Sequence, residues 1–182
     1  MIPLHPLKPK RMNHCISVAK LCYDYALAHQ TDPMKAYLCG IFHDIAREIP
    51  GEEALKLAAE RGIPIGKEEK AEPLLLHGAL AAAAMKENYD ITDETILHAV
   101  ACHTVGDAEM NTLDRILFLA DKAEPLRNYE GVDALREKGF SDLDSAFYEA
   151  VQNEIRYCRE KGYPVHPATL KLQKNLEKER NK

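Results

Sequence analysis

The chain has 182 residues, with 24 Lys and Arg against 29 Asp and Glu, a formal net charge of −5, eight His and five Cys. Its length and its 46% hydrophobic content predict a single domain with a substantial core. The mild negative charge argues against a nucleic-acid polymer as partner, because such binding rests on a basic surface. A small anion bound at one local site stays compatible with this charge.

Export and membrane insertion are not expected. Residues 1–11 are interrupted by prolines and lack the apolar run of a signal peptide. The longest uncharged apolar stretch, residues 73–85, is shorter than the ~20 residues that cross a bilayer. The five cysteines are odd in number, scattered and without a Cys-x-x-Cys motif, which argues against a disulfide framework or a structural zinc site. We therefore predict a cytoplasmic protein without a membrane partner.

Helical periodicity dominates the chain. Apolar residues at i, i+3, i+4 and i+7 predict a helix over Arg11–His29. Asp32 before Pro33 opens a second helix, whose apolar run over residues 36–45 predicts burial on nearly all sides. A short amphipathic helix and a polar loop are predicted next, over residues 52–61 and 63–71. Later helices are predicted over residues 73–88, 92–103, 111–124, 141–161 and beyond 167. No segment alternates as a strand does, so the predicted fold is an all-α bundle.

Ionisable side chains inside these apolar helices carry the functional signal. Burying such a group costs free energy unless it is paired, hydrogen-bonded or bound to a metal. Four of them stand on three predicted helices: His14, His43, Asp44 and Asp121. Two imidazoles and two carboxylates projecting into a bundle form a nitrogen and oxygen ligand set for a divalent transition metal. His77 and His103 lie in two further apolar segments, where they would hold a second metal or contact phosphate.

Each of these histidines also has an interpretation that involves no metal. Taken singly, a histidine on an apolar helix face is more often a core residue with its hydrogen bonds satisfied than a metal ligand. His98 precedes Cys102 by four residues, but nothing nearby in the sequence completes a metal site with them, so packing is the favoured interpretation.

The order and spacing of these residues resemble a known signature. The series His14, His43-Asp44, His77, His103 and Asp121 resembles that of the HD-domain metal-dependent phosphohydrolases, an all-helical superfamily. The local motifs are similar to those of the YqeK family of bacterial symmetrical dinucleoside tetraphosphate hydrolases, over His43–Arg47, His103–Gly106, Met110–Arg115 and Ala120–Arg127. The resemblance covers residues 11–169. It implies an HD-domain helical bundle that cuts diadenosine tetraphosphate into two ADP.

The resemblance also implies roles for individual residues. The metal ligands would be His14, His43, Asp44 and Asp121, with His77 and His103 available to a second metal. The nucleotide contacts would be Arg11, Asp44, Arg47, His77, His103, Asp121, Arg127 and His166. The catalytic residues would be His43, Asp44 and Asp121. The implied metal is iron, with manganese, cobalt or zinc as alternatives. His166 is equally compatible with simple packing of the C-terminal segment.

The residues themselves support this chemistry. A phosphoanhydride resists hydroxide because its negative oxygens repel the nucleophile, so a catalyst must neutralise charge and activate water, and a metal does both. Asp44 is the predicted residue that orients the metal-activated water. Arg47 stands three positions later, which on a helix places its guanidinium beside the metal site.

The sequence also predicts domain bounds and leaves alternatives for the function and the oligomeric state. We predict an N-terminal arm (1–10), an HD phosphohydrolase domain (11–170) and a C-terminal helical tail (171–182). The alternatives to a tetraphosphate hydrolase are a non-catalytic module that binds ADP or GDP, and an HD phosphohydrolase acting on mononucleotides. An apolar helix face on a small enzyme is also compatible with a homodimer.

Overall fold

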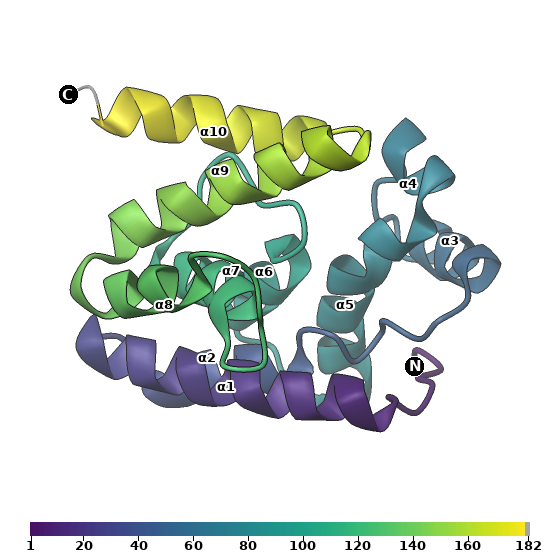
Figure 1. The fold of residues 1–182 in the computed structure, drawn as a ribbon. Coiled ribbons are helices and arrows are strands. Elements are labelled where there is room, and N and C mark those ends of the chain that lie inside the picture. Colours follow the sequence, from purple (N-terminus) through teal and green to yellow (C-terminus); the bar gives the residue numbers. More distant parts are fainter. Residues whose placement is uncertain (181–182) are drawn as a thin grey trace.

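The computed structural model describes residues 1–180; residues 181–182, the end of the predicted tail, lie outside the described residues. Within the described part the fold is all-α and contains no strand (Figure 1). The helices are α1 Pro9–Ala28, α2 Pro33–Phe42, α3 Gly51–Glu60, α4 Lys67–Ala71, the 3₁₀ helix η1 Pro73–Leu76, α5 His77–Tyr89, α6 Glu94–Cys102, α7 Thr112–Ala123, α8 Val132–Ser141, α9 Leu143–Lys161 and α10 Pro167–Arg180. The predicted fold class is therefore confirmed.

Helix α7 is the central element. It packs against α1, α2, α6, α8 and α9, and its run Ile116–Ala120 is completely buried. Its start is fixed by a capping box, in which the Asn111 side chain accepts hydrogen bonds from the backbone N–H groups of Leu113 and Asp114. Around α7, helices α1 and α2 form one side of the molecule, α9 and α10 the opposite side, and α3 to α5 one end (Figure 1).

Two glycines allow helices to approach closely next to the predicted site. A Cβ atom on Gly40 of α2 would lie 2.5 Å from the Cα atom of Ala19 on α1. A Cβ atom on Gly78 of α5 would lie 2.9 Å from the carbonyl oxygens of Val100 and Ala101 on α6. Both distances are too short for any side chain, so these two contacts require glycine. They place His43 against α1 and His77 against α6.

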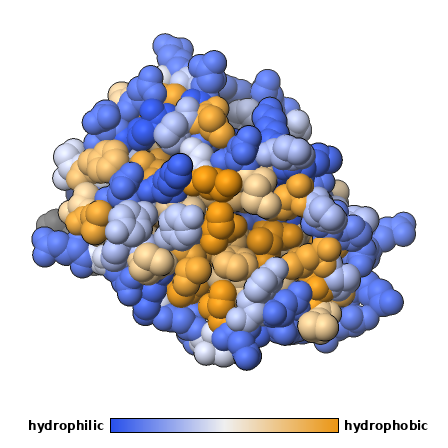
Figure 2. All heavy atoms as spheres, turned by 90° about the horizontal axis from the view of Figure 1, so that it is seen from below, coloured by the Kyte–Doolittle hydropathy of each residue, from blue (hydrophilic) through white to orange (hydrophobic). Residues whose placement is uncertain are grey.

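The prediction that the second helix is buried on nearly all sides is wrong. Only Ala36, Cys39 and Gly40 of α2 are buried, whereas Met34 is 58% exposed. Figure 2, which views the side of α1 and α2, shows hydrophobic side chains gathered across the middle of that face. Some apolar side chains of α2 therefore pack in the core against α1, and others lie on a partly exposed surface.

Two short helices were not predicted. Helix α4 lies within the predicted polar loop, where the Glu69 carboxylate accepts the backbone N–H of Gly66 at 2.7 Å. Helix α8 follows Gly131, which adopts a φ of 84° and offers no capping side chain. Tyr25 of α1 secures α8 by donating its hydroxyl to the carbonyl of Arg136 at 2.9 Å.

The C-terminal helix after Pro167 is confirmed as α10, which buries Leu172 and Leu176 and bonds Thr169 to the carbonyl of Val105 at 2.7 Å. The predicted division at residues 10/11 and 170/171 stays a prediction. Among the described helices, none combines the length and apolar character that a bilayer span requires.

Candidate active site

Six ionisable side chains from five segments meet beside α7. They are His14 on α1, His43 and Asp44 at the end of α2, His77 at the start of α5, His103 after α6, and Asp121 on α7. We call them the histidine–aspartate cluster. All are buried except Asp121, whose side chain keeps 15% of its surface exposed. The structure therefore brings together all six predicted metal ligands.

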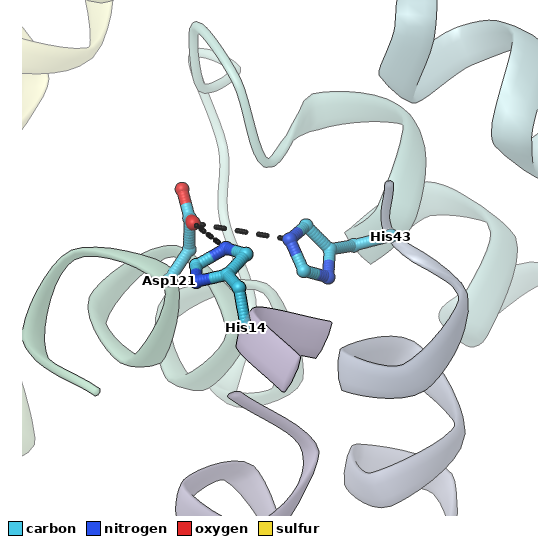
Figure 3. A group of neighbouring side chains, drawn as sticks. All are labelled: His14, His43 and Asp121. Carbon is cyan, nitrogen blue, oxygen red and sulfur yellow. Dashed lines mark hydrogen bonds and ion pairs between the residues drawn. The ribbon is translucent and has the colours of Figure 1, made fainter. Parts of the chain in front are cut away.

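Three members of the cluster form a triangle (Figure 3). The Asp121 Oδ1 atom lies 3.0 Å from His14 Nε2 and 3.8 Å from His43 Nε2. These three side chains can each offer one atom to a single ion. Within residues 1–180, the fully buried His43 Nε2 has no hydrogen-bond partner. An unpartnered buried nitrogen costs free energy, and a metal ion in the triangle removes that cost.

Asp44 links this triangle to the other two imidazoles. Its Oδ2 atom lies 3.4 Å from His43 Nε2, while its Oδ1 atom lies 3.0 Å from His77 Nε2 and 3.9 Å from His103 Nε2. Asp44, His77 and His103 form a second group of atoms close enough to hold one ion. One carboxylate can therefore serve two adjacent positions.

Backbone carbonyls orient three of the imidazoles in the same way. The Nδ1 atoms of His43, His77 and His103 lie 2.6–2.7 Å from the carbonyl oxygens three residues earlier in the chain. A carbonyl only accepts, so Nδ1–H donates and Nε2 of each neutral ring carries the lone pair. The Nε2 atoms of His77 and His103 lie 3.0 Å apart. Two lone pairs this close repel each other unless a cation or proton lies between them, which fits a metal site.

Glu124, which is not among the predicted site residues, orients the fourth imidazole. This carboxylate is 1% exposed, and its Oε1 atom accepts His14 Nδ1–H at 3.0 Å. Its Oε2 atom accepts the backbone N–H of Leu126 at 2.7 Å. A carboxylate behind a ligating histidine fixes the ring and raises its basicity. Glu124 lies within the Ala120–Arg127 motif, but an acidic residue directly after an apolar helix is an ordinary feature of helix ends.

The charges in the cluster also favour a cation. Burial opposes ionisation of Asp44, but the adjacent His43 and His77 imidazoles hold the pKa of that carboxyl well below its usual range. Burial likewise opposes ionisation of Asp121, and Lys122 and His14 hold its pKa low. Burial and the neighbouring His77 keep the pKa of His103 well below its usual value. Two ionised carboxylates and a neutral imidazole therefore face one another.

Four cationic side chains surround the carboxylates. Arg11 Nη1 lies 2.7 Å from Asp44 Oδ2, and Arg47 Nη1 lies 3.5 Å from Asp44 Oδ1. Arg127 donates to Asp121 Oδ1 at 2.9 Å and to the Asp121 carbonyl at 2.8 Å. Lys122, which is not among the predicted site residues, has its Nζ 3.3 Å from Asp121 Oδ2. This side of the cluster can therefore receive a highly anionic ligand.

A cleft of about 1620 Å³ opens at these cations. It extends from the cluster along α9, where aromatic, acidic and further basic side chains line it. The end at the cluster is lined by Arg11, Arg47, Lys122, Arg127 and Tyr129, and the far part includes Tyr148, Tyr157, Glu149, Glu154, Lys138 and Arg156. Sites for drug-sized ligands measure roughly 300–1,000 Å³, so this cleft has room for a larger molecule.

One predicted site residue lies elsewhere. His166 precedes α10, where its Nδ1 accepts the backbone N–H of Ala168 and its Nε2 lies 2.9 Å from Glu69 Oε1. Within residues 1–180 it is not among the side chains lining the cleft. Its nucleotide contact stays a prediction, and its observed role is to connect α10 to α4.

Comparisons with known proteins agree with this geometry. Residues 11–126 match the family model described as HD domain. A protein of Halalkalibacterium halodurans named bis(5'-nucleosyl)-tetraphosphatase, symmetrical, is 34% identical, over 90% of this chain and 87% of that protein. A Bacillus subtilis protein of the same name is 31% identical, over 90% of this chain and 88% of that protein.

A solved structure shares the whole architecture. It is a Clostridium acetobutylicum protein described as a predicted HD superfamily hydrolase involved in NAD metabolism, with a TM-score of 0.91 and 32% identity, covering 95% of this chain and 92% of that one. The HD-domain match includes all six residues of the histidine–aspartate cluster. The family match, the relatives and the cluster geometry lead to one conclusion: this chain belongs to the HD-domain family.

Proposed function

We propose that this protein is a metal-dependent hydrolase that cuts diadenosine tetraphosphate symmetrically into two ADP. The observation that carries the proposal is the convergence of four imidazoles and two ionised carboxylates at the basic end of a large cleft. The relatives named as symmetrical tetraphosphatases support this substrate. They also favour a hydrolase over a non-catalytic module that binds ADP or GDP and over an enzyme for mononucleotides.

The proposed metal ligands are His14, His43, Asp44 and Asp121. The unpartnered Nε2 atom of His43 supports this set, and the facing Nε2 atoms of His77 and His103 support a second ion that shares Asp44. A divalent metal bound here activates the attacking water and polarises a phosphoryl oxygen. We propose iron as this metal, with manganese, cobalt and zinc as the alternatives that elemental analysis would distinguish.

The chain's own residues bind and orient the phosphates. Arg11 and Arg47 flank Asp44, and Arg127 and Lys122 flank Asp121, so positive charge lies on both sides of the reacting position. Guanidinium groups suit phosphate oxygens because they donate two parallel hydrogen bonds. Asp44 is the proposed acceptor of the proton that the attacking water loses.

The far part of the cleft is proposed to hold a nucleoside. Tyr148 and Tyr157 line this part, and an aromatic ring can stack on a nucleobase of any identity.

Product analysis tests the proposal. The metal-loaded protein is incubated with diadenosine tetraphosphate and the products are separated by chromatography. Two ADP is the expected result. ATP plus AMP would contradict symmetrical cleavage, and binding without turnover would favour the non-catalytic module. Asp121→Asn serves as the matched control, since it keeps the shape of the side chain and removes its charge.

A further inference from the structure

A second group of metal-binding side chains joins α6 to α7. His98 and Cys102 lie one helical turn apart on α6, and Asp114 lies in the first turn of α7. We call these three residues the α6–α7 cluster. Within the described residues none of them lines the cleft, and none belongs to the histidine–aspartate cluster. The sequence analysis favours packing for His98 and Cys102 because no third ligand stands beside them in the sequence, and the fold brings Asp114 close to both.

The distances suit a tetrahedral ion. His98 Nδ1 lies 3.0 Å from Asp114 Oδ2 and 3.9 Å from Cys102 Sγ. Nitrogen, oxygen and sulfur ligands at zinc bond lengths of about 2.0–2.3 Å lie roughly 3.3–3.6 Å apart in a tetrahedron. The observed distances bracket this range, so small side-chain shifts would form the site.

Asp114 supplies an independent indication of a missing ligand. Its side chain is 1% exposed, and its Oδ2 atom accepts the backbone N–H of Asn111 at 2.8 Å. In the part of the chain that the structure describes, its buried Oδ1 atom has no hydrogen-bond partner. His98 Nδ1 faces only the Oδ2 atom of this carboxylate, at 3.0 Å, so the contact with His98 does not satisfy Oδ1. A bound cation would satisfy the carboxylate.

The surroundings favour a site with one open position. The His98 side chain is 41% exposed, which gives an ion access from solvent, while Cys102 and Asp114 are buried. Asp107 Oδ2 lies 3.6 Å from His98 Nε2. Asp107 at Nε2 and Asp114 Oδ2 at Nδ1 therefore lie on opposite sides of the ring, and an ion at Nδ1 would displace any proton held there to solvent.

We propose that His98 Nδ1, Cys102 Sγ and Asp114 bind a divalent transition metal ion, zinc being the best match, with water as fourth ligand. A mixed sulfur, nitrogen and oxygen set suits zinc, whereas magnesium and calcium take oxygen ligands. Binding breaks the Cys102 S–H bond, and its proton passes to solvent. The ion would hold the end of α6, next to His103, against the start of α7, the helix that carries Asp121.

Cobalt(II) substitution tests the proposal without relying on turnover. A thiolate bound to cobalt gives a charge-transfer band in the near ultraviolet, and the ligands proposed for the histidine–aspartate cluster include no sulfur. The control is Cys15→Ser, because Cys15 lies close enough to His43 and Asp44 to offer the only thiol near that cluster within residues 1–180. The expected band appears in the wild-type protein and in Cys15→Ser and is lost in Cys102→Ser. Absence of the band in the wild type, or its persistence in Cys102→Ser, would overturn the proposal.

A second pair of variants separates metal binding from folding and from the proposed activity. His98→Ala alters a partly exposed side chain, and Asp114→Asn keeps an oxygen that can accept the Asn111 N–H. Both are expected to lose one equivalent of zinc per chain in a competition titration with a chromophoric chelator. Both should retain turnover of diadenosine tetraphosphate. Wild-type zinc stoichiometry in both variants would refute the site, while failure of the proposed activity would leave these titrations unaffected.

Discussion

At the residue scale, the buried carboxylate of Glu124 fixes the orientation of His14, one of the proposed metal ligands. Replacing Glu124 by Ala removes the acceptor for His14 Nδ1–H, so the ring loses its fixed tautomer and orientation. Loss of such a partner commonly costs about 10–100-fold in metal affinity. We expect a loss of this size in Glu124→Ala, measured by competition with a chelator.

The conservative variant gives the control for this prediction. Glu124→Gln keeps an oxygen that can accept the His14 N–H but removes the negative charge, so its metal affinity should lie between those of the wild type and Glu124→Ala. Circular dichroism should show the helical content of all three proteins unchanged. Equal affinities in all three would mean that Glu124 does not act through His14.

Arg127 has two contacts with Asp121, and a substitution should affect both binding and positioning. Arg127→Ala removes donors to the Asp121 side chain and carbonyl as well as a phosphate contact. Hydrogen bonds to charged groups contribute about 1.5–3 kcal/mol, which corresponds to a fall of roughly 10–150-fold in kcat/KM. Steady-state kinetics should show most of this fall in KM. Arg156→Ala, which removes a guanidinium from the far part of the cleft, is the control and should have a smaller effect.

The residues of the site differ in how far the sequence could reveal them. His43 and Asp121 contrast with the apolar helices around them, and this contrast alone made them candidates. Glu124 and Lys122 stand at a helix end, where charged residues are common. Asp114 stands in a capping box, a sufficient role by itself. The side chains that these residues contact come from other segments of the sequence, so their place in a site can be recognised only in the folded structure.

At the element scale, the contact between α1 and α2 depends on Gly40. An alanine in an ordinary helix position would be favourable, but here the added Cβ would lie 2.5 Å from the Cα atom of Ala19. Overpacking of this kind typically costs about 1–3 kcal/mol. We expect Gly40→Ala to lower the free energy of unfolding by this amount in urea denaturation.

This contact also positions His43, three residues after Gly40. Gly40→Ala should therefore weaken metal binding as well as stability, because α2 must move away from α1. Ala59→Gly, in the exposed part of α3, is a control in which only helix propensity changes. If Gly40→Ala were as stable as the wild-type protein, α1 and α2 would have room that the structure does not contain.

The helices with strong local signals were predictable, and the others were not. Helix α7 combines a capping box with an apolar stripe, and α1 has clear periodicity. Helix α8 begins at a glycine without a side-chain cap and buries only Val132, Leu135 and Gly139, so its packing on Tyr25 stabilises it. Helix α4 has five residues, none of them buried. Both helices depend on tertiary contacts, which the local sequence does not reveal.

At the scale of the whole molecule, metal binding should contribute to stability. A ligand present at 100 times its dissociation constant stabilises the folded state by about 2.7 kcal/mol. For a domain of this size that corresponds to roughly 5–10 °C in Tm. Treatment with a chelator should lower Tm by this amount in differential scanning calorimetry. The shift should nearly vanish in a His43→Ala and His98→Ala double variant, which lacks a ligand from each cluster.

Thiol reactivity reports on the intact core. All five cysteines lie within the described residues, and only Cys158 is not buried. Burial raises the pKa of Cys15 to about 12 and keeps its thiol protonated. In the native protein we expect one thiol to react rapidly with a chromogenic disulfide reagent, and five after denaturation. Cys158→Ser should abolish the rapid phase. A rapid phase of two or more thiols would indicate a more open core.

The three histidines that donate to the carbonyl three residues earlier have a thermodynamic consequence. Each of these rings uses Nδ1–H to satisfy a carbonyl near a helix end, so its side-chain torsions are fixed as the helix forms. The conformational entropy of ordering these ligands is therefore lost during folding and not when the ion arrives. Metal exchange can then proceed without rearranging the protein, and the preference among ions rests on coordination chemistry and supply.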